Sequence, residues 1–202
     1  MQRASLRVEI SGGIAAGKTT LANLLRVGGL VPVFERFRDN PFYAAFYRDP
    51  IGTAFETEIT FLLQHYHQQK IAALTGRDFC SDFSLVLDHA YACVTLPKRE
   101  LTLFRSVLRN VSRKLPPRAL LVHLQCSPRA ELKRIARRHR SVERRISVEY
   151  LSRLDDALQA RVRAIGKREK VLVIDSGRID FAHDQVAKRN VVSQVREALR
   201  RT

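Results

Sequence analysis

Short apolar runs alternate along the chain with longer segments in which apolar residues recur every three or four positions. The short runs predict strands at 6–10, 31–34, 79–81, 119–124 and 171–174. The longer segments have the period of amphipathic helices, and they cover 20–27, 41–47, 54–74, 88–95, 98–112, a stretch that opens at 128, 148–165 and 185–200. Strands that alternate with helices favour an α/β fold, here a five-stranded parallel sheet with helices on both faces.

The segment 54–74 is the longest predicted helix, and the turn residues at 49–52 are expected to separate it from the segment before it. Its expected apolar face is formed by Phe55, Ile59, Leu62, Leu63 and Tyr66. Its polar positions include Glu58, His65 and Gln69.

Length and composition fit one domain over residues 1–202, with enough chain for a substantial core. Cys80, Cys93 and Cys126 have no C-x-x-C spacing, so we interpret them as buried thiols in a reducing cytoplasm. The first predicted strand follows Met1 almost at once, so we expect no signal or transit peptide, and no apolar run reaches membrane-spanning length.

The net charge of +16 is unusual and is compatible with binding to a polyanion such as nucleic acid. Much of this charge lies on the predicted helical stretches 129–145 and 161–170, with no interleaved aromatic residues that would stack on bases. We therefore favour a basic surface together with arginines that handle a phosphorylated ligand, and we expect neither nucleic acid nor a membrane as a partner.

The first predicted strand leads directly into a phosphate-binding loop. Gly12, Gly17, Lys18 and Thr19 have the G-x-x-x-x-G-K-[ST] spacing, and a helical pattern follows as this motif requires. Backbone N–H groups of such a loop surround phosphate oxygens, the lysine reaches the β- and γ-phosphates, and the threonine hydroxyl binds Mg²⁺. We expect ATP or another nucleoside triphosphate to bind the residues of this loop, which are Gly12, Gly13, Ile14, Ala15, Ala16, Gly17, Lys18, Thr19 and Thr20.

Two carboxylates follow predicted strands directly, and ligands of parallel α/β sheets bind at that edge. Glu35 is the candidate base that accepts the proton of the acceptor hydroxyl, the alternative being a solvent-facing loop glutamate. Asp82 is a candidate Mg²⁺ ligand together with Thr19, and a helix N-cap is an equally good interpretation.

A dense group of arginines at 134–145 fits a lid at about 137–146 that closes over transferring phosphates. Arg138 and Arg140 are the candidates for this role, whereas Arg137, Arg144 and Arg145 are expected on the surface. Several remaining side chains are expected to be structural or solvated, namely His89, His123, His183, and, in the core, Tyr91 and the phenylalanines. His65 and His67 lie two residues apart in a predicted helix, so they are not expected to share a metal ion.

These motifs together resemble the deoxyribonucleoside kinase family over nearly the whole chain. The resemblance rests on the phosphate loop, on 34–35 followed by Asp39-Asn40-Pro41-Phe42, on Phe46-Tyr47 and the helix after it, on Ser81-Asp82-Phe83-Ser84, and on the lid pattern 138–143 followed by 150–151. It implies a kinase that transfers phosphate from ATP with Mg²⁺ to the 5′-hydroxyl of a deoxyribonucleoside, in a cytoplasmic homodimer with the P-loop kinase fold.

The resemblance also implies roles for individual residues. Glu35 matches the base for the 5′-hydroxyl, Tyr47 and Glu143 match the pair that holds the 3′-hydroxyl, and Arg138 and Arg140 match the lid arginines. Asp82 matches the acidic residue of the family's Asp/Glu-Arg-Ser motif, and Asp88 matches an aspartate that helps to read the base.

The chain departs from this family at two places. Glu58 stands where the family usually has a base-reading glutamine, and His65 stands where an arginine is customary, so the base specificity is expected to differ. Phe83 replaces an arginine that pairs with the catalytic glutamate in many members, which removes one candidate partner for Glu35.

Three alternatives remain open from the sequence. A kinase of nucleoside monophosphates or other small metabolites would use additional arginines, and Arg36 and Arg38 lie close to Glu35. A basic P-loop ATPase that binds nucleic acid would show activity stimulated by DNA or RNA. A relative that binds nucleotides without catalysis is disfavoured by the intact Lys18, Thr19, Glu35 and Arg138.

Overall fold

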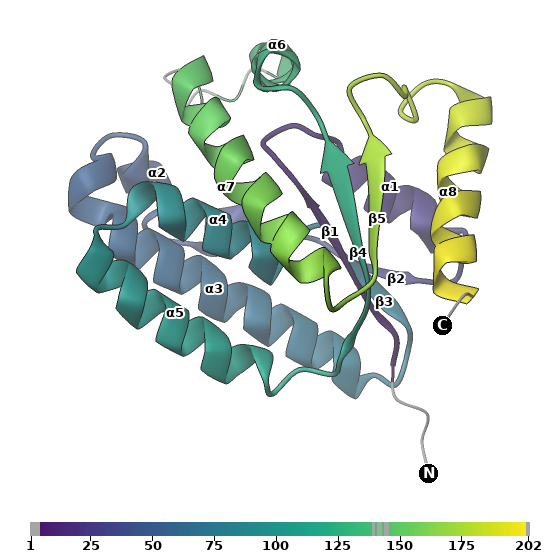
Figure 1. The fold of residues 1–202 in the computed structure, drawn as a ribbon, viewed down its shortest axis with the longest axis horizontal. Coiled ribbons are helices and arrows are strands. Elements are labelled where there is room, and N and C mark those ends of the chain that lie inside the picture. The colour runs from purple at the N-terminus through teal and green to yellow at the C-terminus, as the bar shows by residue number, and fades with distance from the viewer. Residues whose placement is uncertain (1–4, 139, 141–142, 144–145, 201–202) are drawn as a thin grey trace.

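A computed structural model describes residues 5–138, 140, 143 and 146–200. Five parallel strands form one sheet in the order β2-β3-β1-β4-β5 (Figure 1). The strands are β1 (Arg7–Gly12), β2 (Val31–Val33), β3 (Phe79–Ser81), β4 (Arg118–Gln125) and β5 (Val171–Asp175). The predicted parallel five-stranded sheet is confirmed.

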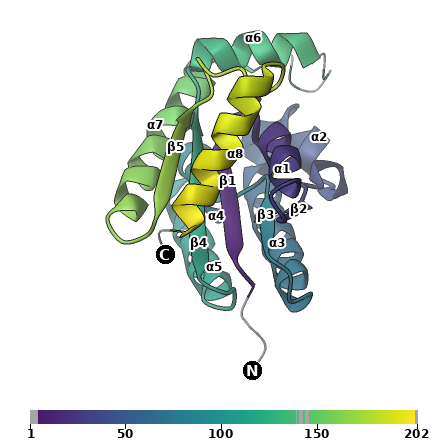
Figure 2. The same cartoon turned by 90° about the vertical axis from the view of Figure 1, so that its right-hand side faces the viewer.

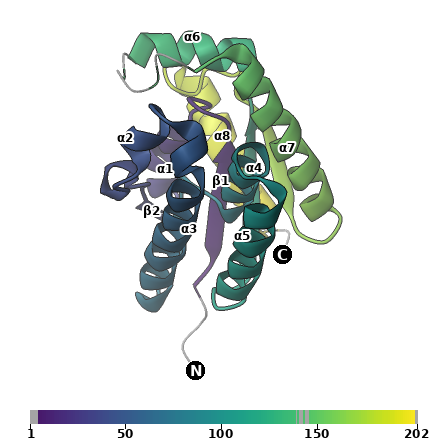
Figure 3. The same ribbon diagram turned by 90° about the vertical axis from the view of Figure 1, so that its left-hand side faces the viewer.

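Helices cover both faces of this sheet, as the sequence predicts. They are α1 (Lys18–Arg26), α2 (Tyr43–Phe46), α3 (Pro50–Leu74), α4 (Leu85–Thr95), α5 (Lys98–Ser112), α6 (Pro128–Arg138), α7 (Val148–Gly166) and α8 (Gln185–Arg200), with a 3₁₀ turn, η1, at Phe37–Asp39. Helices α1 and α8 cover one face (Figure 2). Helices α3, α4 and α7 lie on the other face, and α5 packs outside α3 and α4 (Figure 3). None of the helices in the described part of the chain is long and apolar enough to cross a membrane.

The central strands are buried because helices cover them from both sides. All six residues of β1 are buried, and Ile10 and Leu120 pack with Leu21 of α1 and Val195 of α8 on one face. On the other face, a second apolar cluster contains Leu121 of β4 with residues of α4 and α7. Full burial of one such side chain contributes about 1.5–3 kcal/mol, so these clusters fix the position of the strand ends.

The carboxyl ends of β1, β2 and β3 meet at one edge of the sheet. The register pairs Val33 of β2 with Ser81 of β3, and Glu9 of β1 with the same Ser81. The three segments that follow these strands, including Glu35 and Asp82, therefore lie side by side. Helix α6 crosses above this edge (Figure 1).

The predicted starts of two helices are wrong. Helix α3 begins at Pro50 and not at 54, because the Asp49 side chain accepts a hydrogen bond from the Gly52 N–H and caps it, and proline is favourable in the first turn. Helix α4 begins at Leu85 and not at 88, where the Ser84 hydroxyl caps the Leu87 N–H.

The predicted apolar face of α3 is only partly correct. Leu62 is buried, but Leu63 is 45% exposed. The polar residues Glu58, His65 and Gln69 are 5% exposed or less. They are buried because they form one wall of the site or hydrogen-bond to other buried groups: the Arg7 guanidinium, for example, donates to the Gln69 carbonyl oxygen at 2.9 Å.

All three cysteines are free thiols. Cys80 and Cys126 are buried as predicted, whereas Cys93 is only half-buried. Cys93 lies within 3.6 Å of both His89 and Arg105, so the prediction of three buried thiols is wrong at this position.

Candidate active site

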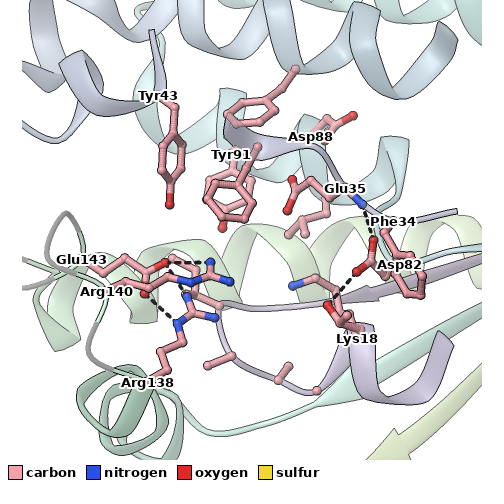
Figure 4. A pocket seen from close by; sticks show the side chains of 18 of the residues that line it. Lys18, Phe34, Glu35, Tyr43, Asp82, Asp88, Tyr91, Arg138, Arg140 and Glu143 are labelled. Carbon is pink, nitrogen blue, oxygen red and sulfur yellow. Dashed lines mark hydrogen bonds and ion pairs between the residues drawn. The ribbon is translucent and has the colours of Figure 1, made fainter. Parts of the chain in front are cut away.

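A cavity of about 720 Å³ opens at the carboxyl edge of the sheet, and the phosphate loop forms one end of it (Figure 4). Sixteen of the predicted site residues line this cavity. They are Ile14, Ala15, Ala16, Gly17, Lys18, Thr19, Thr20, Glu35, Tyr47, Glu58, His65, Asp82, Asp88, Arg138, Arg140 and Glu143. Gly12 and Gly13 do not line the cavity, but their carbonyl oxygens accept hydrogen bonds from Lys18 Nζ at 2.9 and 2.7 Å.

The backbone of the phosphate loop has the conformation expected of an anion site. Gly17 has φ 103°, a conformation that favours glycine, and a Cβ there would lie in tight contact with the Phe181 ring, at 3.0 Å. Ala15 has φ 63°, a left-handed conformation that is uncommon for a residue with a side chain and typical of functional loops. Lys18 is the first residue of α1, so the positive end of this helix points at the same space.

Two side chains of α6 that were assigned no individual role from the sequence support this loop. The Glu131 carboxylate occupies the space beside Gly13, where a Cβ would lie 2.0 Å from Glu131 Oε1. Burial raises the pKa of Glu131 to about 8. Arg134 donates to the carbonyl oxygen of Ser176 at 2.6 Å and contacts that of Ala15 at 3.4 Å. The sequence does carry a signal for this pair: Glu131 and Arg134 lie three residues apart just before the lid, so they share one face of the helix.

Asp82 joins the phosphate loop to the segment after β2. Its Oδ2 accepts from the Thr19 hydroxyl and its Oδ1 accepts from the Glu35 N–H, both at 2.6 Å. The helix-cap interpretation of Asp82 is therefore wrong, since Ser84 caps α4. Burial raises the pKa of Asp82, although both hydrogen bonds oppose this change.

The Glu35 carboxylate lies next to the His65 ring in the cavity. Glu35 Oε1 lies 3.3 Å from His65 Nε2, and the Glu35 side chain is 36% exposed. His65 Nδ1 lies 2.9 and 3.0 Å from the two carboxylate oxygens of Asp88. Burial would lower the pKa of His65, but Asp88 and Glu35 outweigh it and raise this pKa to about 10. Burial would likewise raise the pKa of Glu35, but contact with His65, helped by Lys18, lowers it, so Glu35 is ionised.

Glu58 lies on the same wall and is a buried carboxyl group. Burial, and then the charge of Asp88, raise the pKa of Glu58 to about 8. Glu58 Oε1 lies 3.2 Å from the Thr95 hydroxyl, which also donates to the Tyr91 carbonyl oxygen at 2.9 Å. The Thr95 hydroxyl donates to Glu58 Oε1, a bond that favours the ionised carboxylate, but burial and the charge of Asp88 outweigh it.

The arginines of the predicted lid converge on Glu143 at the opposite side of the cavity (Figure 4). Arg138 makes a bidentate pair with Glu143 at 2.7 and 2.5 Å, and Arg140 lies 3.5 Å from the same carboxylate. The Arg140 guanidinium also lies over the Phe37 ring, 4.5 Å from its centroid. Arg137 is exposed as expected. The surface positions predicted for Arg144 and Arg145, and much of the lid at 137–146, lie outside the described residues.

Aromatic side chains form the rest of the cavity wall, which the sequence analysis missed. Tyr91 was expected in the core but lines the cavity. Phe34, Phe37, Phe46, Phe61, Tyr43 and Tyr150 line it as well. Tyr43 contacts Tyr47 edge-on with ring centroids 5.3 Å apart, and burial raises the pKa of Tyr47, so its hydroxyl is neutral. His183, expected to be structural or solvated, is exposed, lies 3.1 Å from Asp180 and also lines the cavity.

Known proteins similar to this chain are kinases, which agrees with a cavity that has a phosphate loop at one end. A model of the deoxynucleoside kinase family matches residues 8–200. The chain belongs to the deoxynucleoside kinase family. The resemblance inferred from the motifs is thereby confirmed, and the protein is a kinase that phosphorylates nucleosides.

Several relatives of this deoxynucleoside kinase are known. A deoxyadenosine kinase of Dictyostelium discoideum is 32% identical over 174 residues, which cover 83% of this chain and 71% of the relative. A deoxyguanosine kinase of Bacillus subtilis is 25% identical over 200 residues, covering 95% and 97% of the two chains. The fold is similar to that of M. mycoides deoxyadenosine kinase solved with dCMP and a flexible dCDP, with a TM-score of 0.82, 21% identity, and coverage of 95% of this chain and 100% of the other.

Proposed function

We propose that this kinase transfers the γ-phosphate of ATP to the 5′-hydroxyl of a deoxyribonucleoside. The observation that carries the proposal is that one and the same cavity has the phosphate loop at one end and the aromatic wall with Glu58 and Asp88 at the other. Glu35 lies between these two ends (Figure 4). A donor phosphate and an acceptor nucleoside bound in this cavity would meet at Glu35, and this arrangement supports direct transfer.

Glu35 acts in this proposal as the general base. The 5′-hydroxyl loses its proton to the ionised carboxylate of Glu35 while its oxygen forms a bond to the γ-phosphorus. The bond from that phosphorus to the bridging oxygen of ADP breaks in the same step. Lys18, Arg138 and Arg140 balance the negative charge on the phosphate oxygens, and fixed positive groups of this kind contribute strongly to phosphoryl transfer.

Tyr47 and Glu143 are proposed to hold the 3′-hydroxyl of the sugar, and Glu58, His65 and Asp88 to face the base. Glu143 also binds both lid arginines at 3.5 Å or less. The side chain that would recognise the sugar is therefore linked to those that would bind the phosphates, so acceptor binding and lid position would be coupled.

Thr19 and Asp82 are proposed to hold Mg²⁺ at the phosphates. Their oxygens lie 2.6 Å apart, and both are the hard oxygen donors that Mg²⁺ prefers. No group of three or more metal-binding side chains occurs among the described residues. A site with two protein oxygens fits Mg²⁺, which usually keeps several waters and takes further ligands from substrate phosphates. When bound, Mg²⁺ would neutralise charge on the β- and γ-phosphates.

We also propose that residues 1–202 act as a single domain, in a homodimer located in the cytoplasm. The dimer rests on the family resemblance, and the compartment rests on three free thiols. Nucleic acid is not proposed as a partner, although the net charge is +16.

The proposal is tested by supplying ATP and Mg²⁺ with each of the four deoxyribonucleosides, their ribose counterparts and their monophosphates. We expect one or two deoxyribonucleosides to give the 5′-monophosphate, identified by phosphorus NMR. Phosphorylation of monophosphates alone would replace the proposal with a monophosphate kinase. ATP hydrolysis that needs DNA or RNA would replace it with a nucleic-acid-dependent ATPase.

A further inference from the structure

His65 lies between two carboxylates, and each of its ring nitrogens faces one of them. Nδ1 is bonded to both oxygens of Asp88 at 2.9 and 3.0 Å, and Nε2 lies 3.3 Å from Glu35 Oε1. His65 is only 3% exposed, and its Nε2 has no hydrogen bond to any described residue. Among the described residues, the carboxylate oxygen of Glu35 is the partner recorded within ion-pair distance of this buried nitrogen.

Packing fixes the plane of the His65 ring. The Phe83 ring stacks on it with centroids 4.2 Å apart and an angle of 15° between the planes. Phe61 lies on the ring as well, at 5.6 Å and 32°. With its plane held by two aromatic rings and its Nδ1 held by Asp88, the ring can only direct Nε2 toward Glu35.

The protonation state follows from the partners. An ionised carboxylate only accepts hydrogen bonds, so a ring nitrogen that faces one needs a proton. Burial raises the pKa of Asp88, and its contact with His65 opposes this change. With Asp88 and Glu35 both ionised, N–H groups are required at Nδ1 and Nε2, which makes His65 an imidazolium. Glu58, whose pKa is raised to about 8 chiefly by burial, lies on the same wall, and the charges of Lys18 and Arg140 help to lower the pKa of Glu35.

We propose that His65, anchored by Asp88, is the positioning residue that holds the Glu35 carboxylate in place for the acceptor hydroxyl. The imidazolium fixes one oxygen of Glu35 and leaves the other to take the proton. This inference rests on the proposed function, since it assigns the group that orients the base. It adds the positioning of Glu35 to the proposed place of His65 on the wall that faces the base, and a positioning residue affects the rate of transfer more than substrate affinity.

Substitution of His65 by glutamine removes the positive charge and keeps a side chain with a hydrogen-bond donor. General-base catalysis contributes typically 10²–10⁴-fold, so a misplaced base is expected to lower kcat by roughly 10–100-fold. The KM for ATP should stay within about twofold of the wild-type value. His67→Gln is the matched control, because His67 is exposed on the same helix and should leave kcat unchanged.

A second substitution distinguishes positioning from structural support. Phe83 is in contact with the His65 ring, so an arginine at 83 can place its charge in the space that His65→Gln vacates. We expect Phe83→Arg, added to His65→Gln, to recover at least about tenfold of the lost kcat. A double variant that binds ATP normally but is no faster than His65→Gln would overturn the inference. A His65→Gln protein with unchanged kcat, or with a change confined to the KM for the nucleoside, would also overturn it.

Nitrogen-15 NMR of the wild-type protein tests the charge state of His65 directly, and its result does not depend on whether a variant folds. We expect both ring nitrogens of His65 to carry protons at pH 7–8, and a neutral ring with an unprotonated Nε2 would overturn the inference. This measurement needs no turnover, so it tests the role of His65 independently of the kinase assay. The proposed function is refuted separately, by an enzyme that phosphorylates no deoxyribonucleoside in that assay.

Discussion

Substitution of Glu58 by glutamine is expected to stabilise the protein at alkaline pH and to have little effect near pH 5. Glu58 is 5% exposed, and its burial together with the nearby charge of Asp88 favours the neutral carboxyl group. Glutamine has nearly the same shape and also presents one donor group and one acceptor. It does not titrate, so it is compatible with the buried site at every pH.

The size of the effect follows from the pKa of Glu58, which is about 8 in the folded protein against an ordinary value of 4.5. Between these values the folded state binds a proton that the unfolded state releases, so the free energy of unfolding of the wild type falls as the pH rises. Each pH unit in this interval lowers the free energy of unfolding of the wild type by about 1.4 kcal/mol. Relative to a protein with no titrating group at position 58, the wild type therefore loses about 5 kcal/mol above pH 8, but less than about 1 kcal/mol at pH 5.

Thermal or urea unfolding of the wild type and Glu58→Gln at pH 5 and pH 8.5 measures this difference. For a chain of this size, about 5 kcal/mol corresponds to roughly 10–20 °C in Tm. Glu56→Gln, an exposed position on the same helix, should show no pH-dependent gain. If Glu58→Gln changed stability equally at both pH values, Glu58 would be ionised in the folded protein and the reasoning would be refuted.

Two further substitutions test the phosphate end of the cavity. Lys18→Ala removes the cation that contacts the carbonyl oxygens of Gly12 and Gly13, and we expect it to weaken ATP binding and to lower kcat/KM by at least about 100-fold in the kinase assay. A fully active Lys18→Ala protein would refute the loop assignment. Arg138→Ala leaves Glu143 without its bidentate partner, so we expect lower kcat and a higher KM for the nucleoside in steady-state kinetics, whereas Arg137→Ala on the exposed side of the same helix should behave like the wild type. Equal kinetics of the two variants would contradict a role for Arg138.

The sequence predicted the parts of the site that depend on contiguous residues. The phosphate loop from Gly12 to Thr20 is one such part, because its spacing is itself the requirement for wrapping a phosphate. The positions of Glu35 and Asp82 followed from the rule that ligands bind at the carboxyl ends of parallel strands. The five strands were found because short apolar runs in a helix-covered sheet are distinctive.

The contacts that give these residues their charge states could not be predicted, because they join distant segments. His65 and Asp88 are 23 residues apart, and only the packing of α3 against α4 brings them together. Helical periodicity assigned Glu58 and His65 to polar positions, but it cannot distinguish a polar face exposed to water from one that lines a cavity. Tyr91 was expected in the core because it is a large aromatic residue, and such side chains also form the walls of cavities.

The central claim is that Glu35 is the base for the acceptor hydroxyl, and Glu35→Gln tests it most directly. Steady-state phosphorylation of the preferred deoxyribonucleoside is measured together with ATP binding by calorimetry, with Asp39→Asn as the exposed control. Loss of the base should lower kcat by roughly 10²–10⁴-fold, while ATP affinity stays within about twofold because Glu35 acts on the acceptor. A Glu35→Gln enzyme with a kcat close to that of the wild type would contradict the account.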